Sequence, residues 1–252
     1  MDFTKEFISS IVNYKFDYIA FSDNEVSTPK HDFIKEIIIK RKYLKTINEK
    51  IISISGEPCR DNISLLLAAA SCGMIIEISD NDLSKIFSHD FSLAEVQEFD
   101  LEDEINKLCD DFISLIDQSS IVLFTSGTTG KPKRVVLPFS GMCYQSIMIA
   151  NDLMMHNKDR QLFYMPLNYV YGLTVALSTI YSDASLIVSQ YTLDEPSSFF
   201  NQINDLDITC FSGVPFTYDI LVNRWGVEKL KGSSLRQMTQ AGGRLSIEKK
   251  KR

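Results

Sequence analysis

Short apolar runs alternate with longer helix-period stretches along most of this chain, and this alternation strongly limits the folds open to it. Strands that are apolar along their whole length are covered on both faces, as in parallel sheets. Alternation of such strands with helices builds βαβ units. The sequence therefore predicts an α/β fold with mostly parallel sheets flanked by helices. The predicted strands lie at residues 50–56, 74–79, 121–124, 134–138, 161–166, 184–190 and 208–213.

The segments between these strands have the period expected of helices. Asn62 is a candidate N-cap for the first, and Gly73 a candidate stop signal. The acidic segment 91–119 is also helix-like, which favours a link between an N-terminal subdomain and a second subdomain. The predicted helices lie at 62–73, 139–155, around 170–181 and around 196–206.

Composition excludes several classes of protein. The 252 residues are 44% hydrophobic and 23% charged, which are ordinary values for a globular chain. A net charge of -7 argues against a nucleic-acid-binding face, and no apolar run approaches the roughly 20 residues that span a bilayer. Five scattered cysteines without a CxxC pair, three isolated histidines and no signal-peptide pattern predict a cytoplasmic protein with reduced thiols and no metal site.

A polar loop, TSGTTGKPKR at 125–134, comes directly after the apolar run at 121–124. Glycines let successive N–H groups point at an anion, hydroxyl groups add donors, and lysine adds positive charge. The spacing is not that of a Walker A loop, because Gly127 and Gly130 are too close together and Lys131 is followed by Pro132. On composition alone, a solvated turn remains the alternative to a phosphate site.

The longer string IVLFTSGTTGKPKRVVLP, at 121–138, closely resembles the phosphate-binding signature of adenylate-forming (AMP-binding) enzymes. That superfamily includes acyl-CoA synthetases, peptide-synthetase adenylation domains and luciferases. Four further stretches resemble later or earlier family segments, and their order and spacing strengthen a resemblance that covers most of 50–246. These stretches are NISLLLAAASCGMIIEIS (62–79), YMPLNYVYGL (164–173), ITCFSGVPFTYDIL (208–221) and SLRQMTQAGGRLS (234–246).

The resemblance implies an ATP-dependent ligase of the acid–thiol or acid–amine type. Such enzymes join a carboxylic acid to ATP, release pyrophosphate, and pass the acyl group to a thiol or an amine. The implied ligands are ATP with Mg²⁺, a carboxylic acid, and coenzyme A or a carrier-protein thiol. Catalysis of this kind rests on positioning and on neutralising charge as pyrophosphate leaves, and no catalytic residue is assigned.

The resemblance also assigns binding roles residue by residue. Hydroxyl groups of the loop would donate to the β- and γ-phosphates, its glycines would allow close backbone approach, and Lys133 would offset phosphate charge, whereas Lys131 fits a solvated position equally well. The nucleotide-binding candidates are Thr125, Ser126, Gly127, Thr128, Thr129, Gly130, Lys131 and Lys133, with Gly242 and Gly243 beside adenine. The acyl-binding candidates are Asn168, Tyr169 and Gly172.

Several departures from the family pattern stand out. Arg134 replaces a usual glycine, and Phe139 and Tyr169 stand where many members have histidine. The family's Tyr-Gly-x-Thr-Glu motif, whose Glu helps to hold magnesium, its ribose-binding Asp and its lysine-bearing lid domain are absent from 1–252. We therefore expect a truncated AMP-binding domain with an N-terminal subdomain at 1–115, a loop-bearing subdomain at 116–252 and no C-terminal lid. A frameshift, a premature stop or a deliberate crop would each give this chain.

The sequence leaves three functional hypotheses open. The first is the N-terminal part of a carboxylate-activating ligase, incomplete for catalysis by itself. The second is a non-catalytic nucleotide-binding remnant. The third is half of a split ligase, completed by a second chain; apolar surface left by the missing part would favour such a complementing chain or self-association.

Overall fold

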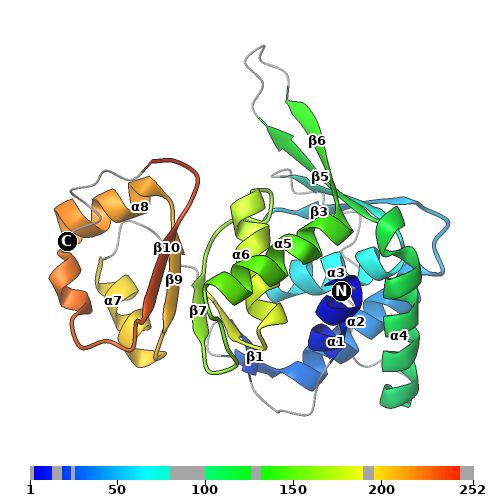
Figure 1. Ribbon diagram of the computed structural model, residues 1–252, viewed down its shortest axis with the longest axis horizontal. Helices are drawn as coiled ribbons and strands as arrows, with labels where there is room; N and C mark the ends of the chain where they lie inside the picture. The colour runs from blue at the N-terminus through cyan, green and yellow to red at the C-terminus, as the bar shows by residue number, and fades with distance from the viewer. Residues whose placement is uncertain are drawn as a thin grey trace.

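The computed structural model describes residues 3–12, 19–23, 26–79, 100–125, 132–189 and 196–244. Its strands form two sheets flanked by helices (Figure 1). The six-stranded sheet has the order β10 (Gln237–Gln240), β9 (Cys210–Gly213), β7 (Arg160–Phe163), β8 (Ser185–Val188), β1 (Ile19–Asp23), β2 (Val26–Pro29). The four-stranded sheet has the order β3 (Ile51–Ser55), β4 (Ile75–Ser79), β5 (Ser120–Thr125), β6 (Lys133–Pro138).

Most strand pairs are parallel, which confirms the α/β fold predicted from the apolar runs. The antiparallel exceptions are β1 with β2 and β5 with β6. The predicted boundary between residues 115 and 116 does not follow the division between the sheets, because β4 and β5 pair across it. The helices are α1 (Phe3–Val12), α2 (Lys30–Leu44), α3 (Arg60–Ser71), α4 (Leu101–Leu115), α5 (Phe139–Asp152), α6 (Val170–Tyr181), α7 (Pro196–Asp205) and α8 (Pro215–Ile220). None of these helices is long and apolar enough to cross a bilayer.

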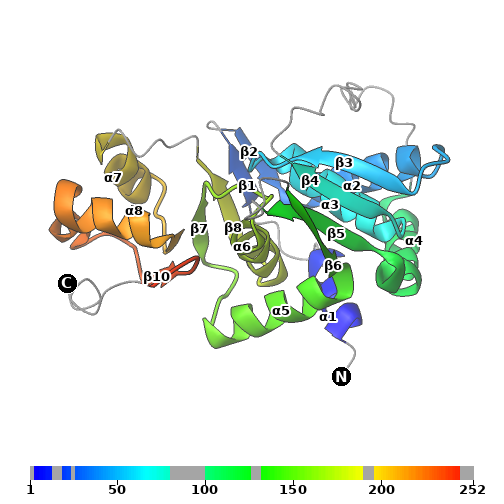
Figure 2. The same ribbon diagram turned by 90° about the horizontal axis from the view of Figure 1, so that it is seen from above.

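The six-stranded sheet is covered on both faces, as the apolar strands require. Successive side chains of a strand point to opposite faces. Accordingly Leu162 and Phe211 belong to a core formed with α7 and α8, whereas Phe163 belongs to the larger core shared with α5, α6 and the four-stranded sheet. Figure 2 shows α7 and α8 on one side of β7 and α6 on the other. Helix α6 therefore lies between the two sheets.

A buried carboxylate ties together the beginnings of three parallel strands. Asp159, which is fully buried, precedes β7 and accepts hydrogen bonds from Arg236 at the start of β10 through both Nε (2.7 Å) and Nη2. It also accepts from Thr209 Oγ1 (2.9 Å), before β9, and from the backbone N–H of His156 (2.9 Å). Burial by itself raises the pKa of Asp159, but these donors outweigh it and hold the pKa below its usual value.

Two local predictions need correction. The N-cap of α3 is Cys59, and Asn62 lies inside the first turn, where its Nδ2 donates to the carbonyl of Glu57 at 3.0 Å. The helix-like segment 91–119 yields α4 over its second half, but α4 is part of the core and not a link, since Leu108 and Phe112 are fully buried. The segment's first part, up to residue 99, lies outside the described residues. Gly73, as predicted, comes after the end of α3, with a φ of 70°.

Candidate functional site

The carboxyl ends of the two sheets are joined by a crossing segment at residues 166–169. Strands β3, β4 and β5 run parallel, as do β7, β8, β9 and β10. After β7 the chain passes to the end of β3, where the N–H of Leu167 donates to the carbonyl of Gly56 at 2.7 Å. Open α/β sheets bind ligands outside the carboxyl ends of their strands, so this edge is the expected place for a site.

The predicted phosphate loop lies between β5 and β6 at the same edge. Its flanking residues Thr125 and Lys133 are opposite each other in the antiparallel register, and Thr125 Oγ1 donates to the carbonyl of Lys133 at 3.4 Å. The hairpin projects from the body of the protein (Figure 1). Six loop candidates lie outside the described residues, and their role stays a prediction: Ser126, Gly127, Thr128, Thr129, Gly130 and Lys131.

Arg134, which departs from the family pattern, has an identifiable partner. Its Nη2 and Nε lie 2.9 Å and 3.3 Å from Oε1 of Glu77 on β4, across the intervening strand β5. The pair is partly exposed, so its contribution to stability is small, about 1 kcal/mol or less. The Arg134 guanidinium, which follows the predicted phosphate loop, therefore points along the sheet toward Glu77.

The Gly242–Gly243 turn comes after β10, the edge strand of the larger sheet. Gly242 has a φ of 80°, a conformation that favours glycine. The side-chain Nε2 of Gln240 donates to the carbonyls of Ala241 (2.9 Å) and Gly243 (2.8 Å), which closes the turn. A Cβ at Gly243 would come within 3.1 Å of Pro215. The turn thus presents backbone, without side chains, at the carboxyl end of β10.

The three predicted acyl-binding residues have different surroundings. Tyr169 is the N-cap of α6, is 63% exposed and lies at the rim of a large pocket. Asn168 packs beside Gly56, where an added Cβ would lie 3.0 Å from its side chain. Gly172 faces the backbone of Pro166, since a Cβ there would lie only 2.2 Å from the Pro166 oxygen. For Gly172 the geometry indicates close helix packing.

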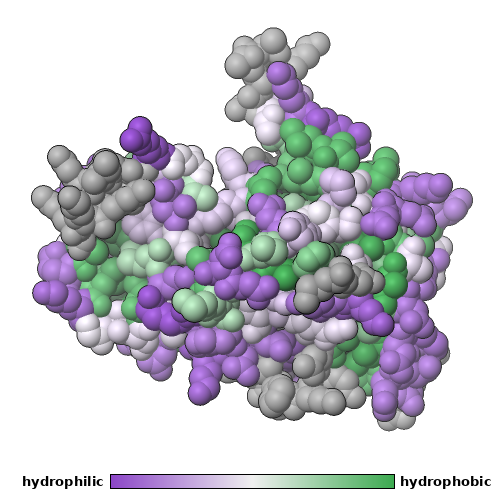
Figure 3. Space-filling model, viewed as in Figure 1, coloured by the Kyte–Doolittle hydropathy of each residue, from purple (hydrophilic) through white to green (hydrophobic). Residues whose placement is uncertain are grey.

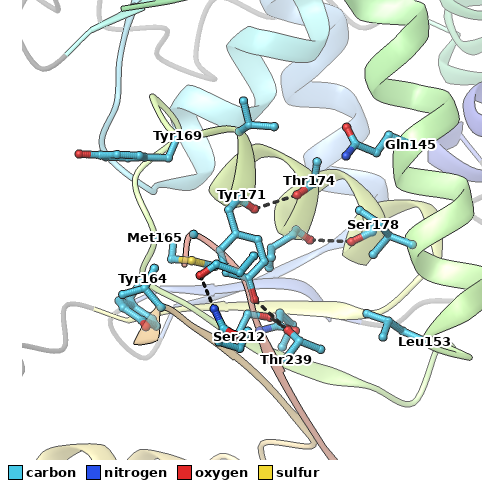
Figure 4. A pocket seen from close by; sticks show the side chains of 18 of the residues that line it. Gln145, Leu153, Tyr164, Met165, Tyr169, Tyr171, Thr174, Ser178, Ser212 and Thr239 are labelled. Carbon is cyan, nitrogen blue, oxygen red and sulfur yellow. Dashed lines mark hydrogen bonds between the residues drawn. The ribbon is translucent and has the colours of Figure 1, made fainter. Parts of the chain in front are cut away.

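A pocket of about 740 Å³ brings several predicted segments together. Its walls come from α5, from the residues after β7, from one face of α6 and from the ends of β9 and β10 (Figure 4). Tyr169 and Gly242, predicted from separate motifs to contact acyl group and adenine, both line it. Other lining side chains are Ile149, Asp152, Leu153, Gln161, Met165 and Val175.

Hydroxyl groups form a connected cluster in the pocket wall. Thr239 Oγ1 lies 3.0 Å from the Tyr171 hydroxyl and 2.8 Å from Ser212 Oγ, and the backbone oxygen of Thr239 accepts from Tyr218 at 2.6 Å. Tyr164 bonds Thr217 Oγ1 at 3.1 Å nearby. Burial raises the pKa of Tyr171, and that of Tyr164 to about 12. These phenols therefore stay neutral at physiological pH and fix the wall by hydrogen bonding.

The sequence reasoning missed this hydroxyl cluster. Part of it could have been predicted from the sequence. One face of α6 carries Tyr171, Thr174, Val175 and Ser178, which recur at helical spacing. Thr239 and Ser212 come from neighbouring strands whose register, Thr239 opposite Ser212, is a tertiary feature. No local pattern marks them.

Comparison with known proteins gives a family match over most of the chain. The model of the AMP-binding enzyme family matches residues 54–252. The chain belongs to that family. Among relatives, a 2-succinylbenzoate–CoA ligase of Bacillus cereus is 29% identical over 172 residues, which are 66% of this chain and 33% of that protein. The chain spans about a third of the length of the curated relatives it matches.

Solved structures show the same fold at low sequence identity. A red-emitting luciferase from Phrixothrix hirtus superposes with a TM-score of 0.75 at 16% identity, covering 98% of this chain and 57% of that one. The N-terminal subdomain of Klebsiella oxytoca NpsA gives a TM-score of 0.74 at 15% identity, covering 97% and 69%. These structures confirm the α/β fold expected from the resemblance, and the family match over residues 54–252 confirms the family.

Proposed function

We propose that this chain is the N-terminal part of an ATP-dependent ligase that activates a carboxylic acid. The observation that carries the proposal is that Tyr169 and Gly242, from motifs 73 residues apart, line one pocket at the carboxyl edge of the sheets. The hairpin that carries the predicted phosphate loop ends at the same edge. An acyl group and an adenosine joined through a phosphate need such a continuous site.

In the proposed reaction a carboxylate oxygen attacks the α-phosphorus of ATP. The new P–O bond gives the acyl-adenylate, and the bond to the leaving pyrophosphate breaks with its electron pair. Lys133, exposed at the start of β6, would neutralise phosphate charge, and Thr125 and the loop after it would donate hydrogen bonds. The pocket would hold the acid in line for attack.

Magnesium enters this proposal as the counter-ion of ATP. Within the part of the chain that the structure describes, no group of three or more His, Cys, Asp or Glu side chains is placed to hold a metal ion. The described residues thus hold no such cluster, and the proposed step does not use a resident metal ion.

The acceptor and the acid are defined only by class. The names of several relatives contain "CoA ligase", which supports coenzyme A, or a carrier-protein thiol, as the acyl acceptor. Those names specify 2-succinylbenzoate for the relatives; for this chain we propose a carboxylic acid. We also propose that the chain acts in the cytoplasm.

We further propose that residues 1–252 bind the substrates but do not turn them over efficiently without additional residues. Groups that act together in catalysis lose far more than a proportional share of rate when some are missing. The alternatives are a non-catalytic nucleotide-binding remnant and one half of a split ligase. One experiment separates these two alternatives. Adding a polypeptide with the metal-binding and lid motifs should restore acid-dependent ATP–pyrophosphate exchange for a split ligase, but not for a nucleotide-binding remnant.

The test of the proposal is binding of Mg-ATP measured by isothermal titration calorimetry. The wild-type chain should bind saturably, and Lys133→Ala should weaken binding by about tenfold or more with the fold retained, since a charge-assisted contact is lost. Arg134→Ala is the matched control, because Arg134 pairs with Glu77, and it should keep affinity within about twofold. No Mg-ATP binding by the wild type, or unchanged affinity in Lys133→Ala, would contradict the proposal.

A further inference from the structure

We propose that the pocket accepts the uncharged tail of a monocarboxylic acid and rejects an acid that carries a second carboxylate at the end of its tail, with Asp152 setting the charge at that end. This inference rests on the proposed function and narrows its substrate class. Three properties of the pocket support it: its direction, the mainly apolar surface of its walls, and its charge.

The pocket has two distinct ends along β10. Its proximal end is the Gly242 turn, after the last residue of β10. Its distal end lies beside the first residue of β10, where Gln237 Nε2 donates to the carbonyl of Leu153 at 3.2 Å. Four strand residues span roughly 13 Å. Asp152, next to Leu153 and itself part of the lining, is therefore at the end away from the reacting carboxylate.

The walls between the two ends offer a tail mainly apolar surface. Ile149, Met165 and Val175 supply apolar groups. Two of the buried polar side chains are already bonded within the protein: Ser178 Oγ donates to the carbonyl of Val175 at 3.2 Å, and Gln161 Nε2 to that of Leu162 at 2.8 Å. Burial of apolar atoms is thus the main interaction available to a tail.

The charge of the pocket should discriminate between acids that differ only at the end of the tail. Among the described residues that line the pocket there is no Lys, Arg or His, and Asp152 is the charged one. The nearest cation, Arg236, donates from Nη2 to the carbonyl of Met154, just after α5, at 3.3 Å. Its guanidinium is already bound by buried Asp159. A second carboxylate at the distal end would gain no cation there and would meet the like charge of Asp152.

The experiment compares two non-hydrolysable acyl-adenylate mimics, octanoyl-sulfamoyl-adenosine and 7-carboxyheptanoyl-sulfamoyl-adenosine, by equilibrium binding to the full chain. The two differ only in the terminal carboxylate. We expect the octanoyl compound to bind at least 30-fold more tightly. Equal affinities would overturn this inference and leave the ligase proposal standing, whereas failure of both compounds to bind would overturn the ligase proposal and this inference together.

Charge variants locate the effect. Asp152→Lys should reduce the preference at least tenfold, because it replaces repulsion by attraction. Asn151→Lys is the matched control: the neighbouring residue is also exposed but borders a different, polar pocket, and its preference should stay within about twofold of wild type. Asp152→Asn, a milder change, should reduce the preference about threefold and serves if Asp152→Lys does not fold. An equal change in Asn151→Lys, or no change in Asp152→Asn and Asp152→Lys, would contradict the role of Asp152.

Discussion

The pocket wall and the β5–β6 hairpin contribute to the same proposed site but are built differently. In the wall, Ser178 is buried, and hydroxyl groups of Tyr171, Ser212 and Thr239 bond one another. On the hairpin, Val136 is 52% exposed. Figure 3 shows hydrophobic surface there. The hairpin is held chiefly by its antiparallel ladder and by pairing of β5 with β4.

Because of this difference, we expect substitutions in the wall to affect stability and substitutions on the hairpin to affect binding. The wall is fixed by buried groups that must all be satisfied, so substitutions there should change the free energy of unfolding. Most side chains of β6, the outer strand of the hairpin, already face solvent, so substitutions there should change stability little. Substitutions at buried residues that support the wall, and one matched pair that compares wall and hairpin directly, test that contrast.

Asp159→Ala should have the largest effect. It removes a buried carboxylate that accepts from Arg236, Thr209 and the backbone of His156, and so frees the beginnings of β7, β9 and β10. Breaking a buried pair from one side costs about 3–5 kcal/mol. Urea unfolding would measure it, with Asp110→Ala on the exposed side of α4 as the control, expected within about 0.5 kcal/mol. Equal losses in both variants would show that Asp159 is not a structural anchor.

Gly172→Ala should destabilise by about 2–3 kcal/mol, because the new Cβ would overlap the Pro166 oxygen at 2.2 Å and push α6 away from the crossing segment. The same substitution at Gly141, in α5, meets no atom within 4 Å and should stabilise by about 0.5–1 kcal/mol. Thermal unfolding of the two variants gives the comparison directly. A stable Gly172→Ala protein would mean that the close packing of α6 is not required.

A third prediction replaces valine by threonine once in each region. Val175→Thr, at a position on α6 that is 7% exposed, should lower the free energy of unfolding by about 1–2 kcal/mol, because it places a hydroxyl group in the wall. Val136→Thr, at a half-exposed position on β6, should change the free energy of unfolding by no more than about 0.5 kcal/mol. Chemical denaturation of both variants measures the difference. A larger loss at Val136 than at Val175 would reverse the contrast between wall and hairpin.

Asp159 should make the stability of the protein depend on pH in the acid range. The folded state holds the pKa of Asp159 below its ordinary value near 4, because Arg236 and the other donors outweigh burial. Its contribution is therefore fully present above that value and is lost as the pH falls through the lower, folded-state pKa. Unfolding free energies measured from pH 7 to pH 2 should fall more steeply at the acid end for wild type than for Asp159→Asn. Parallel curves would contradict this assignment.

The sequence predicted the elements whose pattern is local. Apolar strand runs located β3 to β9, and the motif around 234–246 located β10 with its glycine turn. The region before residue 50 was not predicted, because α2 buries Lys40 and Arg41, which would be exposed on an isolated helix. Their partners, such as Asp61 and Asp111, come from distant parts of the chain, and no local pattern shows such pairing.

For the candidate site, motifs identified two residues that line the pocket, Tyr169 and Gly242, but not its hydroxyl cluster. Their roles in binding stay predictions, and Gly172 packs closely against Pro166. Thr239 and Ser212 meet Tyr171 only through strand register and the approach of α6. These contacts arise from tertiary packing, so a single sequence does not reveal them.

The most direct measurement is a crystal structure of the chain with an acyl-sulfamoyl-adenosine bound. We expect the acyl tail between α5 and α6 along β10, the adenine against Gly242 and Gly243, and the sulfamoyl group facing the Thr125–Lys133 hairpin. A ligand bound elsewhere, or no ligand in crystals soaked above the measured dissociation constant, would contradict the proposal that these elements form one acyl-adenylate site.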